Sequence, residues 1–174
     1  MDIRDGLITI KNFVSKEEGE KLSKYILEYE STIKSLGPDI YGGTSNDSLT
    51  GRFNVFNYLE HEPGEILNPK LKDMFGECLV QCWANTFRKG EGIEPHKHSN
   101  KFRSGMVCAN LFLSGVNNGN WYEAEGDIIN EIGTLVVFPN DYVHGVKPNT
   151  SDAIRISMAF DIYTLPKANT YHVK

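Results

Sequence analysis

Short strands dominate the second half of the chain, and they limit its possible folds more than any other feature. Residues 80–88, 105–113, 134–138 and 154–163 each have a strand pattern, and clusters of Gly, Asn and Pro separate them. This spacing is typical of a β-sandwich or a small barrel rather than of parallel α/β units. We therefore predict a mainly β fold of the α+β class with a barrel at its centre.

The last of these strands alternates between two kinds of side chain. Arg155, Ser157 and Ala159 share one face, and the other face is large and apolar throughout. A strand with one bulky face and one small, charged face is expected to border a cavity rather than a solid core. The same alternation makes Asn85 and Asn110, on two other strands, candidates for the lining of that cavity.

The first 79 residues read as a mixed segment of strands, helices and a loop. Ser15 and Glu18 have the spacing of a capping box, which predicts that a helix begins there. A strand is predicted over residues 7–10 before this helix, and another over 52–59. A second helix of about ten residues, extending to Leu79, is predicted from an N-cap at Asn68. The expected buried stripe of the first helix is Leu22, Tyr25, Ile26, Tyr29 and Ile33.

We expect one domain over residues 1–174, with the N-terminal strands, helices and loop in 1–79 and the barrel core in 80–165. The two helices are expected to cover one sheet of the barrel. Residues 37–48 are rich in Gly, Ser and Asn, and they read either as a lid that brings Tyr41 to a substrate or as an ordinary surface loop.

Composition excludes several classes of partner. There are 18 Lys and Arg against 23 Asp and Glu, so the formal net charge is −5, and no basic run offers a surface to nucleic acid. The N-terminus lacks the apolar core of a signal peptide, and no apolar run is long enough to span a membrane. Cys78, Cys82 and Cys108 fit neither a disulfide framework nor a zinc knuckle, and we expect reduced thiols. These features predict a soluble, cytoplasmic protein.

Three histidines are candidates for one metal site. His96 and His98 are separated by one residue, so in an extended segment both project from the same side. His144 follows the apolar run 134–138, where a strand would return a side chain to the same place. Neutral imidazoles bind Fe, Zn, Cu or Ni, and three protein ligands leave positions open for catalysis.

Arg155 narrows the choice of chemistry. A guanidinium on the inner face of a barrel is costly unless an anion meets it, and its planar fork matches a carboxylate. A carboxylate one small-molecule length from a metal describes 2-oxoglutarate, whose keto-acid end chelates the ion. The alternative is a buried ion pair between Arg155 and Asp152 or Asp161.

Taken together, these residues resemble the Fe(II)/2-oxoglutarate-dependent oxygenases, and within them the prolyl 4-hydroxylase-like group, whose fold is a double-stranded β-helix (a jelly-roll, cupin-like barrel). The similar segments are 6–18, 92–96, 133–144 and 155–157, so the resemblance extends over most of the chain. It implies that His96 and His144 bind iron. It also implies that Arg155 binds the distal carboxylate of 2-oxoglutarate, with Ser157 beside it.

The metal motif departs from the usual pattern of the family, which is His-x-Asp or His-x-Glu. His98 occupies the second position here, and segment 98–105 resembles relatives that carry His-x-His before a Ser-Gly strand. Either His98 is a ligand, or it lies behind the ligands and a carboxylate comes from Glu94, Glu123 or Glu125.

A second departure is Phe87, which stands where prolyl hydroxylases carry a tyrosine that hydrogen-bonds the co-substrate. Asn85, on the same strand face, is the candidate for the missing donor.

Cupins share the barrel and offer an alternative function. Their second motif is matched by most of residues 133–144, but Phe102 and Arg103 stand where a cupin carries its glutamate. A cupin would be an epimerase or a sugar-binding module, and it leaves Arg155 unexplained.

We predict an Fe(II)- and 2-oxoglutarate-dependent hydroxylase that uses O2, with ascorbate as a supporting reductant. Its metal ligands would be His96, His98 and His144, and its co-substrate contacts Arg155, Ser157, Asn85 and Asn110. The resemblance favours a peptide or protein prolyl residue as substrate, and small molecules remain the alternative.

Overall fold

A capping box starts the first helix in the computed structural model, which describes residues 6–38, 49–98, 106–116 and 119–164. The Ser15 hydroxyl accepts a hydrogen bond from the Glu18 amide at 3.1 Å, and the Glu18 carboxylate accepts one from the Ser15 amide at 2.7 Å. Both interactions satisfy backbone donors that a helix start leaves without partners. The predicted start of this helix is confirmed.

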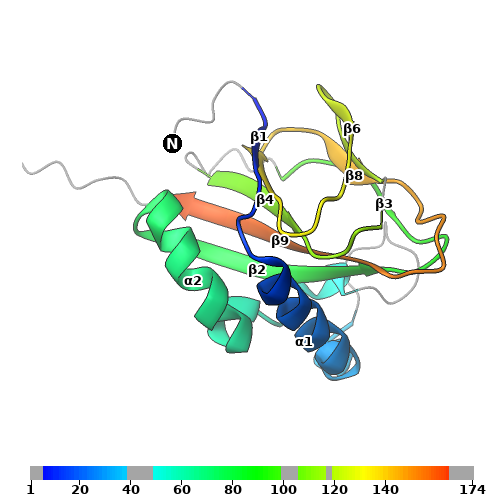
Figure 1. The fold of residues 1–174 in the computed structure, drawn as a ribbon, viewed down its shortest axis with the longest axis horizontal. Coiled ribbons are helices and arrows are strands. Elements are labelled where there is room, and N and C mark those ends of the chain that lie inside the picture. Colours follow the sequence, from blue (N-terminus) through cyan, green and yellow to red (C-terminus); the bar gives the residue numbers. More distant parts are fainter. Residues whose placement is uncertain (1–5, 39–48, 99–105, 117–118, 165–174) are drawn as a thin grey trace, which may run out of the picture.

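The described elements follow one another as helices, 3₁₀ turns (η) and strands (Figure 1). They are β1 (Ile8–Ile10), α1 (Lys16–Ser35), η1 (Thr50–Arg52), η2 (Tyr58–Glu60), α2 (Glu62–Phe75), β2 (Cys78–Phe87), β3 (Ile93–His96), β4 (Met106–Phe112), β5 (Asn120–Tyr122), β6 (Gly126–Ile128), β7 (Leu135–Pro139), β8 (His144–Val146) and β9 (Arg155–Thr164).

The strands form two antiparallel sheets. The major sheet has the order β1-β7-β4-β9-β2, and the minor sheet has the order β3-β8-β5-β6. Most neighbouring strands are far apart in sequence, as in β2 and β9, which pair along their whole length from Cys78↔Thr164 to Phe87↔Arg155. This mainly β arrangement with two helices confirms the predicted fold class, including the four strands expected after residue 80.

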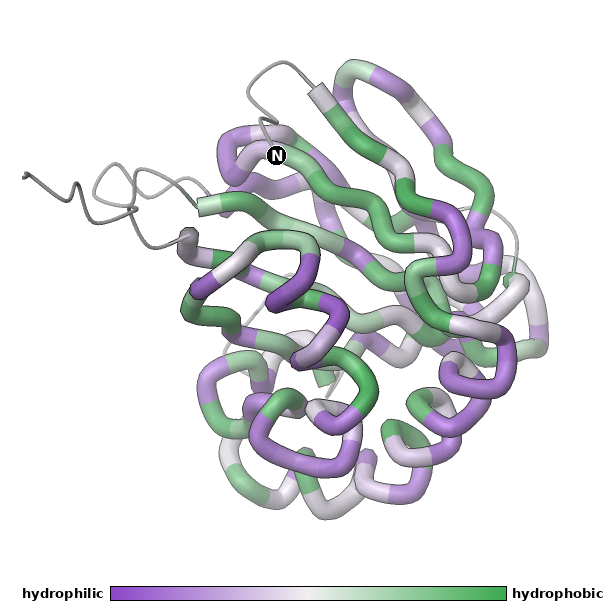
Figure 2. The backbone as a smooth tube through the Cα atoms, turned by 60° about the vertical axis from the view of Figure 1, so that its left-hand side comes forward, coloured by the Kyte–Doolittle hydropathy of each residue, from purple (hydrophilic) through white to green (hydrophobic). Residues whose placement is uncertain are grey.

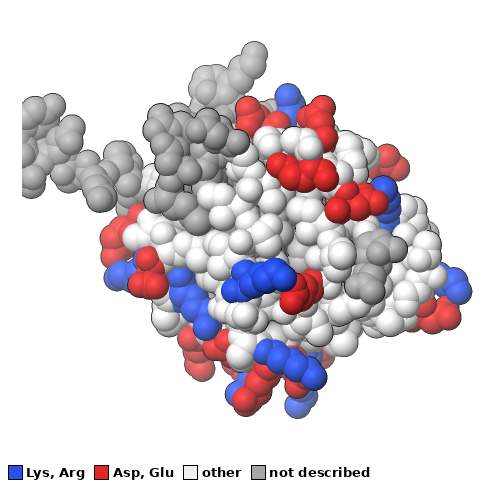
Figure 3. All heavy atoms as spheres, turned by 45° about the horizontal axis from the view of Figure 1, so that its top comes forward, with Lys and Arg blue, Asp and Glu red and all other residues white. Residues whose placement is uncertain are grey.

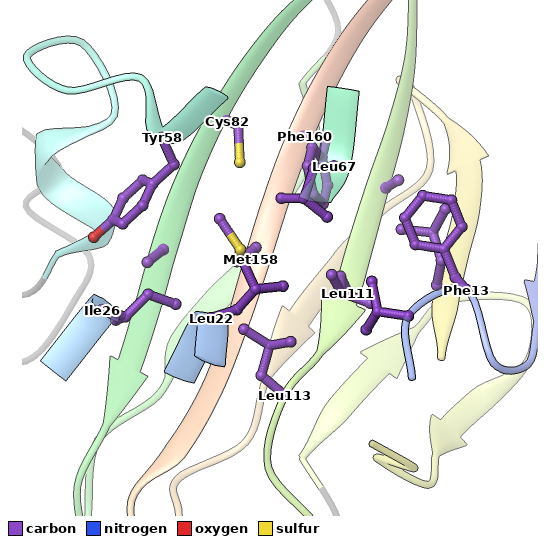
Figure 4. Close-up of a cluster of buried hydrophobic side chains, with 14 of the residues drawn as sticks. Phe13, Leu22, Ile26, Tyr58, Leu67, Cys82, Leu111, Leu113, Met158 and Phe160 are labelled. Atoms are coloured by element: carbon purple, nitrogen blue, oxygen red, sulfur yellow. The ribbon is translucent and has the colours of Figure 1, made fainter. Parts of the chain in front are cut away.

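Both helices cover one face of the major sheet, opposite the side on which the minor sheet lies (Figure 1). Leu22 and Ile26 of α1 and Leu67 of α2 pack there against Met158 and Phe160 of β9 (Figure 4). In Figure 2 the helices alternate between hydrophilic and hydrophobic residues along their turns, as a half-buried helix requires. The predicted bulky face of the last strand is therefore the face that packs on the helices.

The predicted stripe of α1 is correct at three positions. Leu22, Ile26 and Ile33 are buried, whereas Tyr29 is 40% exposed. Tyr29 stacks on Tyr25, with ring centroids 4.4 Å apart, so this pair lies along the edge of the helix interface.

The strand predicted over residues 52–59 is wrong, because the 3₁₀ turns η1 and η2 overlap the two ends of the segment and no strand lies between them. The Asn57 carboxamide replaces a strand ladder there. Its oxygen accepts from the amides of Leu59 and Cys82, and its nitrogen donates to the Val80 carbonyl. One side chain thus ties the segment to β2 and caps η2, and weak hydrophobic alternation gave no sign of this.

The second helix begins earlier than predicted. It covers Glu62–Phe75, with Pro63 in its first turn, and Pro69 lies inside it rather than at its start. Leu67 and Leu71, on either side of Pro69, are buried against the sheet, so tertiary packing outweighs the local cost of the proline. The predicted end was too late, since Gly76 adopts a φ of +73° directly after the helix and Leu79 belongs to β2.

Two predictions concern residues outside the described part of the chain. They are the loop interpretation for residues 39–48, including Tyr41, and the resemblance of the segment 99–105 after the metal motif.

Candidate metal centre

The three predicted histidines meet at one end of the space between the two sheets. His96 ends β3 and lies directly opposite His144, the first residue of β8, in the antiparallel pairing of these strands. His98 follows β3 by two residues. The ring centroids are 4.4 to 5.2 Å apart, and the candidate ligand atoms all lie within 4.8 Å of one another. The structure therefore brings together the set that the sequence singled out.

Hydrogen bonds at Nδ1 fix the tautomer of each ring. His96 Nδ1 lies 2.9 Å from the Glu94 carbonyl oxygen, and His144 Nδ1 lies 3.0 Å from the Tyr142 carbonyl oxygen. His98 Nδ1 lies 2.7 Å from Asp161 Oδ1. Carbonyl and carboxylate oxygens only accept, so Nδ1 carries the hydrogen in all three rings. Each neutral imidazole then has its lone pair on Nε2, the nitrogen that a metal would bind.

The two Nε2 atoms of His96 and His98 are 3.2 Å apart. Two nitrogens that bind one ion at right angles and at about 2.1 Å each are separated by about 3.0 Å. At this distance either a hydrogen-bonding proton or a metal cation can lie between the two nitrogens. The observed spacing thus fits a shared metal ion.

Burial favours the neutral form of the His96 and His144 imidazoles. It lowers the pKa of His144 to about 3, and the neighbouring His96 and His98 act in the same direction. Burial also lowers the pKa of His96. Both rings are therefore neutral at physiological pH, which is the form that coordinates a metal.

A carboxylate that the sequence reasoning did not assign to the site lies behind His98. Asp161 of β9 accepts from His98 Nδ1 and also lies 3.4 Å from the Cys108 thiol, its cross-strand neighbour on β4. The signal was present in the alternation of β9, because the inward face Arg155, Ser157, Ala159 continues to Asp161. The sequence alone indicates Asp161 only as a possible ion-pair partner for Arg155.

The three glutamates proposed as alternative metal ligands do not converge with the histidines. The side chains of Glu94, Glu123 and Glu125 are exposed, and the Tyr142 hydroxyl donates to Glu125 at 3.3 Å. Glu94 contributes its backbone carbonyl to His96 instead. In the part of the chain that the structure describes, the nearest carboxylate to the imidazoles is that of Asp161.

A cavity of about 290 Å³ extends from the imidazoles between the sheets. The predicted co-substrate residues Asn85, Asn110 and Ser157 line it, as do Trp83 and Asp161. The strand phases inferred from the sequence are therefore correct for β2, β4 and β9.

A chain of buried hydrogen bonds orders the polar part of the cavity wall. Thr50 Oγ1 donates to Asn85 Oδ1 at 2.5 Å, and Asn85 Nδ2 donates to Ser157 Oγ at 3.2 Å. Ser157 then keeps its own hydroxyl hydrogen for a ligand. Asn110 Nδ2 donates to the hydroxyl of Tyr122 at 2.9 Å, so Asn110 is held in place by β5. Thr50 and Tyr122 are contributions that sequence reasoning missed.

Arg155 lies two residues from Ser157 on the same face of β9, and it is only 2% exposed. Its Nη1 donates to the Lys147 carbonyl at 2.9 Å, while its buried Nε has no hydrogen-bond partner. The two predicted alternatives are not observed, because Asp152 pairs with Lys89 and Asp161 with His98. The cavity wall itself includes Ser157 but not Arg155, which lies one strand pleat further along β9.

The Arg155 guanidinium thus lacks a carboxylate partner among residues 6–38, 49–98, 106–116 and 119–164. Burial lowers its pKa, yet an arginine stays charged at neutral pH. A buried cation without an anion is costly, so this site fits a carboxylate ligand.

Gly119 closes one side of this guanidinium. A Cβ at position 119 would lie 2.5 Å from Cζ and from both Nη atoms of Arg155, so only glycine leaves room for the planar group. The Gly119 backbone is itself fixed, since its carbonyl accepts from the Lys147 amide at 2.7 Å.

Surface charge is mixed on the face shown in Figure 3, where Lys and Arg side chains are scattered among Asp and Glu. The described helices are too short or too polar to cross a lipid bilayer.

Residues 112–161 match the family described as "Putative 2OG-Fe(II) oxygenase", a segment that contains His144, Arg155, Ser157 and Asp161. A search of curated proteins gave no match.

Solved structures share the fold at low sequence identity. A Pseudomonas putida prolyl-4-hydroxylase superposes with a TM-score of 0.63 at 17% identity, covering 92% of this chain and 94% of that one. The viral collagen prolyl hydroxylase of Paramecium bursaria Chlorella virus-1 gives 0.62 at 12%, covering 91% and 90%. A non-heme monooxygenase, ThoJ, in a nickel complex gives 0.58 at 16%, covering 92% and 74%.

The match over residues 112–161 confirms the predicted resemblance to the Fe(II)/2-oxoglutarate-dependent oxygenases in that part of the chain. The similar solved structures confirm the double-stranded β-helix of the prolyl 4-hydroxylase-like group as the fold.

Proposed function

We propose that this protein is an Fe(II)- and 2-oxoglutarate-dependent dioxygenase that hydroxylates a C–H bond. In this proposal His96, His98 and His144 hold the iron, and Arg155 binds the distal carboxylate of 2-oxoglutarate. Ser157, Asn85 and Asn110 contribute polar contacts from the cavity wall.

One observation carries the proposal, namely the convergence of three Nε2 lone pairs at one end of the cavity. The Nδ1 hydrogens of all three rings are directed at fixed acceptors, so in the neutral form each ring has its Nε2 lone pair available at the shared point. A divalent transition metal is the partner that suits three neutral imidazoles, and the ligand chemistry is compatible with iron.

Arg155 supports the choice of co-substrate. A five-carbon dicarboxylate carries one carboxylate for the metal end and one for the guanidinium, and the buried, unpartnered Nε is ready to donate. The chemistry that iron and 2-oxoglutarate supply when bound is the activation of O2, with 2-oxoglutarate converted to succinate and CO2. The protein binds and orients the co-substrate, while apolar residues such as Trp83 keep water from the reacting end.

The substrate is proposed at the level of its class. Two of the similar structures bear the names of prolyl hydroxylases, which favours a prolyl residue in a peptide or protein, and a small molecule is the second possibility. A cytoplasmic location is proposed as well, because Cys78, Cys82 and Cys108 are all free thiols in the structure.

Succinate formation tests the function directly. The protein is incubated in air with Fe(II), ascorbate and 2-oxoglutarate, together with panels of proline-containing peptides, free amino acids and small metabolites. We expect 2-oxoglutarate-dependent succinate above the background of a His144→Ala control, and stimulation by one class of substrate. A protein that binds metal tightly but neither binds nor consumes 2-oxoglutarate would instead favour the cupin alternative.

A further inference from the structure

We infer that Asp161 is a positioning residue for His98 and that it returns to the metal centre the negative charge that the His-x-His motif removes. The inference rests on the proposed function in one respect, since it takes His98 to be a metal ligand. It concerns a side chain to which neither the motif nor the comparisons assign a role.

The geometry places the carboxylate where it can act on the ring. Asp161 Oδ1 lies 2.7 Å from His98 Nδ1, the short distance expected for a hydrogen bond to a charged acceptor. The side chains of Asp161 and His98 are 14% and 17% exposed, so water screens the pair little. A carboxylate at Nδ1 holds the ring in the Nδ1–H tautomer and makes Nε2 a stronger donor to a metal.

Contacts with Trp83 and Cys108 also hold the pair of His98 and Asp161 in place. Trp83 stacks on the His98 ring with ring centroids 5.9 Å apart and an interplanar angle of 28°. Cys108 lies opposite Asp161 in the pairing of β4 with β9, and its thiol donates to the same Oδ1 at 3.4 Å. Asp161 therefore has a fixed orientation, with one strong donor and one weak donor on a single oxygen.

Asp161 acts through His98 rather than as a ligand to the same ion. Its carboxylate groups with His98 and Cys108, whereas the cluster of converging ligand atoms at the metal position consists of His96, His98 and His144. Three neutral imidazoles leave the net charge of the ion uncompensated by its ligands. An acid group directly behind one ligand supplies that compensation in the next layer.

Metal affinity provides a test that does not depend on turnover. The full-length protein is titrated with Co(II) without O2, in a Trp121→Phe background in which Trp83 is the sole tryptophan and its fluorescence reports the ion. Asp161→Asn keeps an oxygen acceptor and removes the charge. We expect it to raise the Kd for Co(II) by about 10- to 100-fold, the usual effect of losing such a partner.

Two comparisons separate this role from general destabilisation. Asp152→Asn makes the same chemical change at an exposed site paired with Lys89, and it should leave the Kd within about threefold of the parent, as expected of surface changes. In a His98→Ala background, Asp161→Asn should have no further effect on the Kd, because the residue acts through the missing ring.

The outcomes are distinct. Parent-like Co(II) affinity of Asp161→Asn overturns the inference, and so does an equal loss of affinity with and without His98. Parent-like affinity of His98→Ala removes His98 from the proposed ligand set, which is a failure of the proposed function. If Asp161→Asn does not fold, ¹⁵N NMR of the unmodified metal-free protein decides, since the inference requires the Nδ1–H tautomer of His98 and is overturned by the Nε2–H tautomer.

Discussion

Gly119→Ala is expected to separate co-substrate binding from metal binding, because the atoms nearest to the added methyl group all belong to the Arg155 guanidinium. The added Cβ would lie 2.5 Å from Cζ and both Nη atoms, whereas heavy atoms in contact prefer about 3.5 Å or more. The guanidinium must therefore move by about 1 Å. The Gly119 backbone cannot easily move instead, because its carbonyl is bonded to the Lys147 amide.

The size of the effect follows from the hydrogen bonds to 2-oxoglutarate that the displaced Arg155 guanidinium would lose. A hydrogen bond to a charged group contributes about 1.5–3 kcal/mol, so losing one of two such bonds weakens 2-oxoglutarate binding by roughly 10- to 100-fold. The φ of +127° at Gly119 adds a backbone cost of about 1–3 kcal/mol to folding when alanine replaces glycine. This backbone cost lowers the stability of the folded protein, but it does not weaken 2-oxoglutarate binding more than metal binding.

Isothermal titration of 2-oxoglutarate into the Co(II)-loaded protein without O2 measures the loss, and a Co(II) titration of the same variant measures metal affinity. Gly126→Ala is the matched control, because Gly126 also has a positive φ of +76° but has nothing within 4 Å of an added Cβ. If Gly119→Ala binds 2-oxoglutarate like the parent, or loses metal affinity in step with it, the role assigned to Arg155 is wrong.

Two further predictions test the anchor and the fold. Arg155→Ala should weaken 2-oxoglutarate binding by about 100-fold or more, while metal content stays close to that of the parent. Arg155→Lys should recover only part of the 2-oxoglutarate affinity, since it keeps the charge but loses the planar pair of donors. Equal 2-oxoglutarate affinity of all three proteins would contradict this prediction. Glu30→Gln should lower the free energy of unfolding by about 3 kcal/mol at pH 7, because hydrogen bonds from Arg88 and the charge of Lys34 lower the pKa of Glu30 from 4.5 to about 2. The pKa is lowered on folding, so this stability is present above pH 4.5 and is lost as the pH falls toward 2. Urea unfolding of both proteins should therefore show a difference that shrinks on acidification, and a constant difference would contradict the reasoning.

The sequence predicted the parts of the fold that depend on local pattern. Alternation along β9 separated Met158 and Phe160, which pack on the helices, from Ser157, which lines the cavity. The capping box marked the start of α1. These features are readable because strand and helix periodicity connect a residue's position to the face it occupies.

The predictions from sequence failed where side-chain hydrogen bonds took the place of a regular backbone pattern, or where two interacting residues are far apart in the sequence. Asn57 holds residues 52–59 against β2 through its carboxamide, which leaves no periodic signal. The helix start near residue 62 was hidden because Pro69, inside the helix, looked like a first helical position. Asp161 and His98 are 63 residues apart, so only the assembled sheets bring them together.

The candidate metal position lies where the two sheets come together. His96 and His144 belong to strands of the minor sheet, while His98 is bonded to Asp161 on β9 of the major sheet. An ion held by the three rings would therefore act as a cross-link between the layers, comparable to a disulfide in a sandwich that has none among its described residues. Metal binding would then also join the two sheets at this end. The residues that form the site would therefore contribute to the stability of the sandwich as well as to its chemistry.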